Sequence, residues 1–183
     1  QVIIDTPTNF GGTAEKAYAF DRCYWSHDPA DADFADQRTV FAELGTSIEA
    51  NALDGYNNCL IAYGQTGSGK TYSVLGGKGN EQEGLVPRLV KRFFDTAEAR
   101  KNAEEPLQLD FTVSFLEIYN EMLVDLLNAE EKKTLQVRHH KKFGVFVEGL
   151  ATIAVHSETE VEEWLDFGTK NRSVGATAMN EQS

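Results

Sequence analysis

Short apolar runs alternate with helically spaced apolar residues along this chain of 183 residues. After a strand and loop predicted over residues 14–33, a helix is predicted from residue 36 to residue 55. Four apolar residues recur there at helical spacing: Val40, Phe41, Leu44 and Ile48. Residues 58–63 form a short apolar run that reads as a buried strand. A further helix is predicted from about Pro87.

The second half of the chain continues this alternation. Residues 107–119 are apolar on both faces, which is typical of a central strand covered on both sides. Residues 121–127 are predicted to form a short helix, and residues 135–138 and 145–147 two strands around a basic turn. A sequence similar to a capping box begins at Ser157 and precedes a last helix. Strands that alternate with helices predict a layered α/β domain.

The strongest chemical signal follows the predicted strand at residues 58–63. Residues 64–71 match the phosphate-binding P-loop pattern at every required position. The glycines allow a tight turn that brings successive N–H groups close to one anion, and a helix starting near Gly69 would add its dipole. Lys70 would lie on the outer phosphates, and the Thr71 hydroxyl would bind Mg²⁺. The expected nucleotide-binding residues here are Gly64, Gln65, Thr66, Gly67, Ser68, Gly69, Lys70 and Thr71.

Composition and charge narrow the class of protein. A hydrophobic fraction of 41% is typical of a globular chain. The net charge of −12 argues against broad nucleic-acid binding, which relies on a positive surface. No apolar run approaches the length of a membrane span, so we expect no membrane insertion. Cys23 and Cys59 lack metal-ligand spacing and favour a reduced, intracellular setting.

Several separated segments resemble the kinesin motor domain, and the resemblance covers nearly the whole chain. Residues 63–72 resemble the kinesin P-loop with its flanking Tyr and Gln, and residues 111–127 resemble the family's central strand and the following helix. Residues 20–27 are most similar to the kinesin-3 transport subfamily. Six residues match the spacing that leads into the first nucleotide switch: Gly168, Arg172, Thr177, Met179, Asn180 and Ser183.

The resemblance implies a P-loop NTPase fold of three layers, in which helices flank a central mixed β-sheet. It implies an ATP-dependent microtubule motor of the cytoplasm and cytoskeleton, a microtubule-stimulated ATPase with ATP, ADP and Mg²⁺ as ligands. Cargo would bind through tail regions that these residues lack. Residues 1–183 would be a partial motor domain without the first strand, most of switch one, switch two, the main microtubule-binding helix and the neck linker. We therefore expect these 183 residues alone to be inactive.

The resemblance also gives individual residues a role. Tyr72 would pack on the adenine. Asn180 and Ser183 would open switch one, which senses the γ-phosphate and positions the attacking water, so Lys70 and Ser183 are the expected catalytic residues. Asp125 is not expected to hold Mg²⁺, because it falls on a predicted helix and the family places this function in switch two.

A basic cluster lies between the two predicted strands in this acidic chain. It consists of Arg138, His139, His140, Lys141 and Lys142. In kinesins this region faces tubulin, so the resemblance implies a microtubule contact. The alternative is a solvated hairpin tip, since charge clusters commonly lie in solvent.

Two other classes of function fit the same residues. A kinesin-like module could bind microtubules or nucleotide without hydrolysis, and a degenerate switch two would favour it. An unrelated P-loop enzyme, such as a nucleotide kinase, could use the same loop. Stimulation by microtubules would separate that enzyme from a motor.

Overall fold

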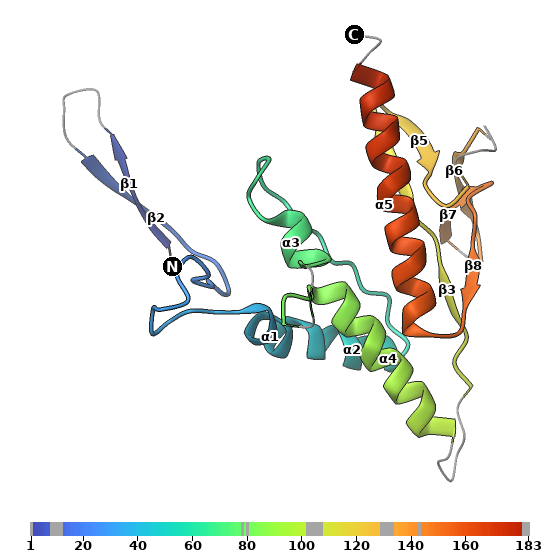
Figure 1. Ribbon diagram of the computed structural model, residues 1–183, viewed down its shortest axis with the longest axis horizontal. Helices are drawn as coiled ribbons and strands as arrows, with labels where there is room; N and C mark the ends of the chain where they lie inside the picture. Colours follow the sequence, from blue (N-terminus) through green and yellow to red (C-terminus); the bar gives the residue numbers. More distant parts are fainter. Residues whose placement is uncertain are drawn as a thin grey trace. The chain divides into compact units, whose positions relative to one another are not determined.

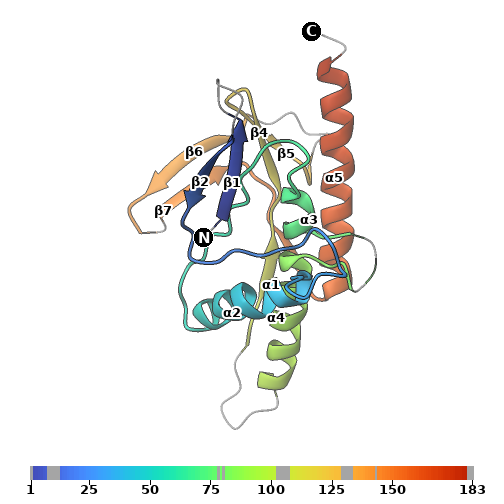
Figure 2. The same ribbon diagram turned by 90° about the vertical axis from the view of Figure 1, so that its left-hand side faces the viewer.

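The structure is a computed structural model that describes residues 2–7, 13–77, 79, 81–101, 108–128, 134–142 and 144–180. For residues 6, 7, 13 and 173–180 it describes the backbone alone. The chain divides into two compact units, Gln1–Arg88 and Leu89–Ser183, which are described separately. Figure 1 labels most of their helices and strands, and Figure 2 also labels β4.

The first unit begins with a β-hairpin of β1 (Val2–Pro7) and β2 (Thr13–Tyr18). The two strands are antiparallel, with Val2 opposite Tyr18 and Pro7 opposite Thr13. The strand predicted near Tyr18 is therefore the second strand of a hairpin. Its described side chains are exposed, so the hairpin contributes little to the core.

A continuous helical path follows the loop after β2 and confirms the helix predicted from residue 36. It consists of α1 (Gln37–Val40), a π-helical turn η1 (Phe41–Gly45) and α2 (Thr46–Leu53). Asp36 caps α1, because its carboxylate accepts a hydrogen bond from the Thr39 amide at 2.7 Å. This bond holds the pKa of the Asp36 carboxyl below its usual value. Gly55, at φ 88°, ends the path where the sequence predicts it.

Residues 56–63 differ from the prediction of a buried strand. They belong to neither a helix nor a strand, and no described strand pairs with them. Ile61 is 79% exposed and Tyr63 is 99% exposed. A buried strand needs a neighbouring backbone on at least one edge, and the described residues do not supply one. The apolar composition of the run therefore does not result in burial here.

The helix that the P-loop opens is interrupted, as predicted. This helix is α3 (Lys70–Val74), which ends at Val74. After a loop, the next helix, α4 (Leu85–Lys101), begins. The loop closes on itself because the Gly77 amide donates to the Gln82 carbonyl at 2.8 Å. A side chain on Gly84 would lie 2.6 Å from the backbone of Val74, so the base of the loop requires glycine.

The second unit contains three antiparallel pairs of strands, among the residues that the structure describes. The strands are β3 (Phe111–Val113), β4 (Leu116–Tyr119), β5 (Met122–Asp125), β6 (Gln136–His140), β7 (Gly144–Glu148) and β8 (Ile153–Val155). β3 pairs with β8, β4 with β5, and β6 with β7. The strand predicted over residues 107–119 is thus split, because its partner changes at Ser114 and Phe115.

The helix predicted over residues 121–127 is wrong, since Met122–Asp125 is the strand β5. Asn120 and Glu121 have φ angles of 46° and 65°, and Tyr119 lies opposite Met122. A two-residue turn with both φ angles positive is the usual connection of a tight hairpin. The hairpin was missed because Glu121 is an unusual residue for such a turn, in which glycine is preferred.

Asp125 is a buried structural carboxylate at the end of β5, with 8% of its surface exposed. One oxygen accepts hydrogen bonds from the amides of Leu127 at 2.9 Å and Asn128 at 3.1 Å. The other accepts from the Ala151 amide at 2.7 Å. The Asp125 carboxylate therefore fixes the turn after β5 and connects this turn to the residues before β8.

The last helix, α5 (Glu158–Asn180), begins where the sequence predicts it. The Ser157 hydroxyl accepts from the Glu160 amide at 3.2 Å, and the Glu160 carboxylate accepts from the His156 amide at 2.8 Å. The reciprocal bond of the capping box thus reaches the residue before Ser157. In Figures 1 and 2, α5 lies along β5, and the Asn171 amide donates to the Leu126 carbonyl at 2.7 Å.

We predict that Asp125→Ala lowers the free energy of unfolding by about 3 kcal/mol, because it leaves three backbone amides without an acceptor. Urea denaturation at neutral pH would measure this change. Asp125→Asn keeps one acceptor oxygen and should recover part of the loss. Asp166→Ala, on the exposed side of α5, is the matched control. Equal stability of Asp125→Ala and Asp166→Ala would contradict the structural role of Asp125.

Candidate functional site

The P-loop connects residues 56–63 to α3, and its backbone follows a path that favours glycine. Gly67 and Gly69 have φ angles of 79° and 88°, in the left-handed region that other residues rarely adopt. A side chain at Gly64 would collide with the hydroxyl of Ser68, so this glycine allows a close approach within the loop. The motif's glycines are thus required for two reasons: the left-handed backbone at Gly67 and Gly69, and the close contact at Gly64.

Lys70 folds back over the loop at the start of α3. Its ammonium group donates to the carbonyl of Gly64 at 2.8 Å and to the carbonyl of Gln65 at 2.7 Å. The side chain is half-buried, and the two bonds close the loop into a ring around the positive charge. The loop therefore holds a cation at its centre.

Four backbone amides in and just after the loop have no backbone acceptor in the part of the chain that the structure describes. Among the described residues, no backbone carbonyl accepts from the amides of Gly67, Gly69, Lys70 or Thr71. Unpaired amides around a fixed cation are the donor set that phosphate groups require. Because α3 has only five residues, these amides and Lys70 contribute more than a helix dipole would.

The Thr71 hydroxyl is exposed at the start of α3 and can serve as one oxygen ligand of Mg²⁺. The described residues contain no group of three or more His, Cys, Asp or Glu side chains placed to hold a metal ion. Mg²⁺ commonly binds with one or two protein oxygens and takes its other ligands from phosphates and water. The residues present fit a metal that arrives with a nucleotide.

Tyr72 lies beside the P-loop and is 49% exposed. It lines a cavity of about 470 Å³ within the first unit, together with Gln37, Arg38 and Glu81. This volume is in the range of small-molecule sites. Tyr72 thus lines a space of suitable size for a small molecule, and its role against the adenine stays a prediction.

The two predicted switch residues are not tested by the structure. Asn180 is the last residue of α5, with only its backbone described, and Ser183 lies outside the described residues. Asp125, which the sequence analysis excluded as a Mg²⁺ ligand, uses both carboxylate oxygens for backbone amides. The exclusion stands, although Asp125 lies on a strand and not on the predicted helix.

The basic cluster lies on the hairpin of β6 and β7. Arg138, His139 and His140 belong to β6, and Lys141 and Lys142 lie in the turn that follows. The Arg138 guanidinium forms an ion pair with Glu148 of β7 at 3.0 Å, which partly neutralises it. The positive charge of the hairpin is therefore concentrated at the two lysines of the turn.

The sequence analysis missed an apolar face of this hairpin. Val137 lies opposite Val147, and His139 lies opposite Val145, so these four side chains share one face. Val137 is 60% exposed and Val145 is 69% exposed. The alternating valines of β7, Val145 and Val147, together with Val137 of β6, are the signal that could have revealed it. The hairpin thus combines a basic turn with exposed apolar side chains.

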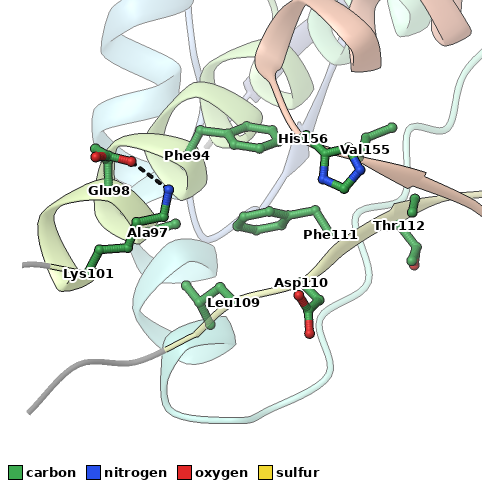
Figure 3. A pocket seen from close by; sticks show the side chains of 11 residues that line it. Phe94, Ala97, Glu98, Lys101, Leu109, Asp110, Phe111, Thr112, Val155 and His156 are labelled. Atoms are coloured by element: carbon green, nitrogen blue, oxygen red, sulfur yellow. Dashed lines mark hydrogen bonds and ion pairs between the residues drawn. The ribbon is translucent and has the colours of Figure 1, made fainter.

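A second cavity, of about 260 Å³, lies in the second unit. Figure 3 shows the rings of Phe94 and Phe111 next to each other at this cavity; their centroids lie 4.5 Å apart and their planes are tilted by 45°. At its edge, Glu98 and Lys101 form an ion pair at 2.7 Å. None of the predicted site residues lines this cavity. Among the described residues, no helix has the length and apolar character needed to span a membrane.

Comparisons with known proteins agree on one family. The family model of the kinesin motor domain matches residues 5–183. The kinesin-like protein KIF13B of Homo sapiens is 44% identical over 170 residues, which are 92% of this chain and 9% of that protein. The kinesin-like protein KIF1B of Homo sapiens is 42% identical over 171 residues, 93% of this chain and 9% of that protein.

Solved structures give the same result. A KIF14 dimer, in complex with a microtubule and AMP-PNP, matches with a TM-score of 0.77 and 33% identity. The match covers 94% of this chain and 49% of that one. A fast kinesin matches with a TM-score of 0.78 and 32% identity, over 92% of this chain and 44% of that one. The chain thus spans about a tenth of its curated relatives and about half of these solved chains.

Proposed function

The chain belongs to the kinesin motor-domain family, and from this membership we propose that it is the nucleotide-binding part of an ATP-driven microtubule motor. The P-loop carries the proposal, because it combines four unpaired backbone amides with the ammonium group of Lys70. The relatives KIF13B and KIF1B support a place in the kinesin-3 group. Family membership argues against an unrelated P-loop enzyme such as a nucleotide kinase.

In this proposal, Lys70 exchanges the carbonyls of Gly64 and Gln65 for the outer phosphate oxygens of ATP. The exchange replaces neutral acceptors by charged ones, which form stronger hydrogen bonds. The amides of Gly67 and Gly69 donate to the same phosphates, and the Thr71 hydroxyl holds Mg²⁺. When bound, Mg²⁺ neutralises phosphate charge. Gln65, Thr66 and Ser68 complete the loop that surrounds the phosphates.

Three further residues have roles that rest on the family resemblance. Tyr72 packs against the adenine, on the side where the cavity of about 470 Å³ is open. Asn180 and Ser183 belong to switch one, where Ser183 positions the attacking water. Hydrolysis in this family depends mainly on such positioning and on stabilisation of charge. Residues 1–183 would then be part of a motor domain whose other catalytic groups lie elsewhere in the protein.

The partner surface that we propose is the hairpin of β6 and β7. Its lysines, Lys141 and Lys142, would contact acidic groups of tubulin, with Arg138, His139 and His140 beside them. KIF14 structures in complex with microtubules support this choice of partner. A cytoplasmic, microtubule-associated location follows from the same proposal. Cargo would bind to regions outside these residues.

A kinesin-like module that binds nucleotide without hydrolysis is the second candidate. It shares the P-loop and differs only in turnover, so one experiment separates the two. Steady-state ATPase of the complete protein, with and without microtubules, should show turnover that rises with microtubule concentration. Nucleotide binding without any turnover would favour the non-hydrolysing module.

Lys70→Ala in the complete protein should lower the rate of ATP hydrolysis by a factor on the order of one hundred or more. The variant loses the positive charge that stabilises the transferred phosphoryl group. Steady-state phosphate release measures the effect. Lys101→Ala, which removes a surface lysine that is paired with Glu98, is the matched control and should retain the parental rate. A Lys70→Ala protein that hydrolyses ATP at the parental rate would refute the role of this lysine.

Replacing Lys141 and Lys142 together with alanine should weaken microtubule affinity, mainly through a slower association rate. The chain carries a net charge of −12, so attraction must come from local positive groups. The difference should shrink as salt rises, because the Debye length is about 8 Å at physiological ionic strength. Co-sedimentation at several salt concentrations measures it.

Two exposed helical lysines, Lys91 and Lys170, provide the matched control when they are replaced together. ATP hydrolysis in the absence of microtubules should not change in either double variant. Unaltered affinity of the turn variant at low salt would mean that the turn is only a solvated tip.

A further inference from the structure

Gln37 is a buried polar residue at the start of α1, with 7% of its surface exposed. Its side-chain amide donates to the backbone carbonyl of Tyr72 at 2.6 Å. Tyr72 lies in α3, the short helix that follows the P-loop, and 35 residues separate the two. Burial of a polar side chain costs free energy unless the side chain is hydrogen-bonded. The bond to Tyr72 therefore explains how Gln37 can be buried.

The carbonyl of Tyr72 needs this donor because α3 ends early. In a continuing helix the amide of Gly76 would donate to Tyr72, but here the amides of Leu75 and Gly76 both donate to the carbonyl of Thr71. The chain then turns into the loop that ends at Gly84. The last carbonyls of a helix require partners from elsewhere, and Gln37 supplies one for Tyr72.

Gln37 is itself held in place by the segment before it. Asp36 caps α1 through the Thr39 amide at 2.7 Å. The amide of Ala35 donates to the carbonyl of Trp25 at 2.6 Å, and the Ser26 hydroxyl donates to the carbonyl of Ala35 at 2.6 Å. A donor fixed in this way can determine where its acceptor lies.

We propose that Gln37 is a positioning residue for nucleotide binding, which acts through Tyr72 on the base side of the site. Both residues line the cavity of about 470 Å³ next to the P-loop. The hydrogen bond holds the backbone of Tyr72 and thereby limits the positions that its side chain can take beside that cavity. This inference rests on the proposed function, because it assumes that the base of a nucleotide binds against Tyr72.

Gln37→Met tests the proposal, since methionine conserves the volume and removes the donor. In the 183-residue chain with Mg²⁺, the dissociation constant of ADP should rise about fivefold, the scale of one hydrogen bond. The dissociation constant of inorganic pyrophosphate, which has no base, should not change. Thr39→Val is the matched control: it removes the hydroxyl bond to Asp36 on the same helix and should alter neither constant.

A double-mutant cycle separates positioning from general stabilisation. In a Tyr72→Ala background, Gln37→Met should have no further effect on ADP binding, because the ring through which Gln37 acts is gone. An equal loss of ADP and pyrophosphate binding, or a full effect of Gln37→Met without the Tyr72 ring, would overturn the proposal. Gln37→Asn, with its amide one methylene shorter, replaces Gln37→Met if the latter does not fold.

Hydrogen exchange without nucleotide keeps this inference separate from the proposed function. The amides of residues 73–76 should exchange faster in Gln37→Met than in Thr39→Val, because α3 loses a bond that holds its end. Unchanged exchange would refute the role of Gln37 even if ADP binds. A wild-type chain that binds neither ADP nor pyrophosphate would refute both the proposed function and a role of Gln37 in nucleotide binding.

Discussion

The hydrogen bonds from the Lys70 ammonium group to the carbonyls of Gly64 and Gln65 hold the P-loop in the shape on which the site depends. They bring a positive charge to the centre of a loop in which the amides of Gly67, Gly69, Lys70 and Thr71 have no acceptor among the described carbonyls. The Lys70 ammonium group and these amides are all hydrogen-bond donors. They are therefore suited to bind an anion that can accept several hydrogen bonds at once.

The segments around the P-loop determine where its helix, α3, ends and how that end is held. The interruption after Val74 shortens the P-loop helix, and the glycines at 76 and 84 let two backbone stretches meet at its end. Gln37 then provides the hydrogen bond that the shortened helix lacks. In the second unit, Asp125 has the comparable task of binding the backbone amides around β5. Its carboxylate thus has a structural role, and the chemistry of the chain is concentrated in residues 64–72.

Predictions from short sequence patterns were correct where a single residue meets a local structural requirement, such as a left-handed turn or a helix cap. The glycines predicted the turns of the P-loop, and the serine before α5 predicted the start of that helix, because each requirement is satisfied within a few residues. The role of Lys70 in the nucleotide site stays a prediction. Predictions failed where the secondary structure of a segment depends on strands that are distant in the sequence. Residues 58–63 have a strand composition but no strand beside them in the described chain, and residues 121–127 follow the pairing of β5 with β4. The Gln37–Tyr72 contact joins distant positions, so no local pattern indicates it.

The most direct test of the nucleotide site is a calorimetric titration of this chain with ADP in the presence of Mg²⁺. The account predicts saturable binding of one ADP per chain. It also predicts that inorganic pyrophosphate competes with ADP, because both ligands use the loop amides and Lys70. Removal of Mg²⁺ should weaken ADP binding, since Thr71 then has no metal to hold. Absence of binding at millimolar ADP, or ADP binding that pyrophosphate does not affect, would contradict the account.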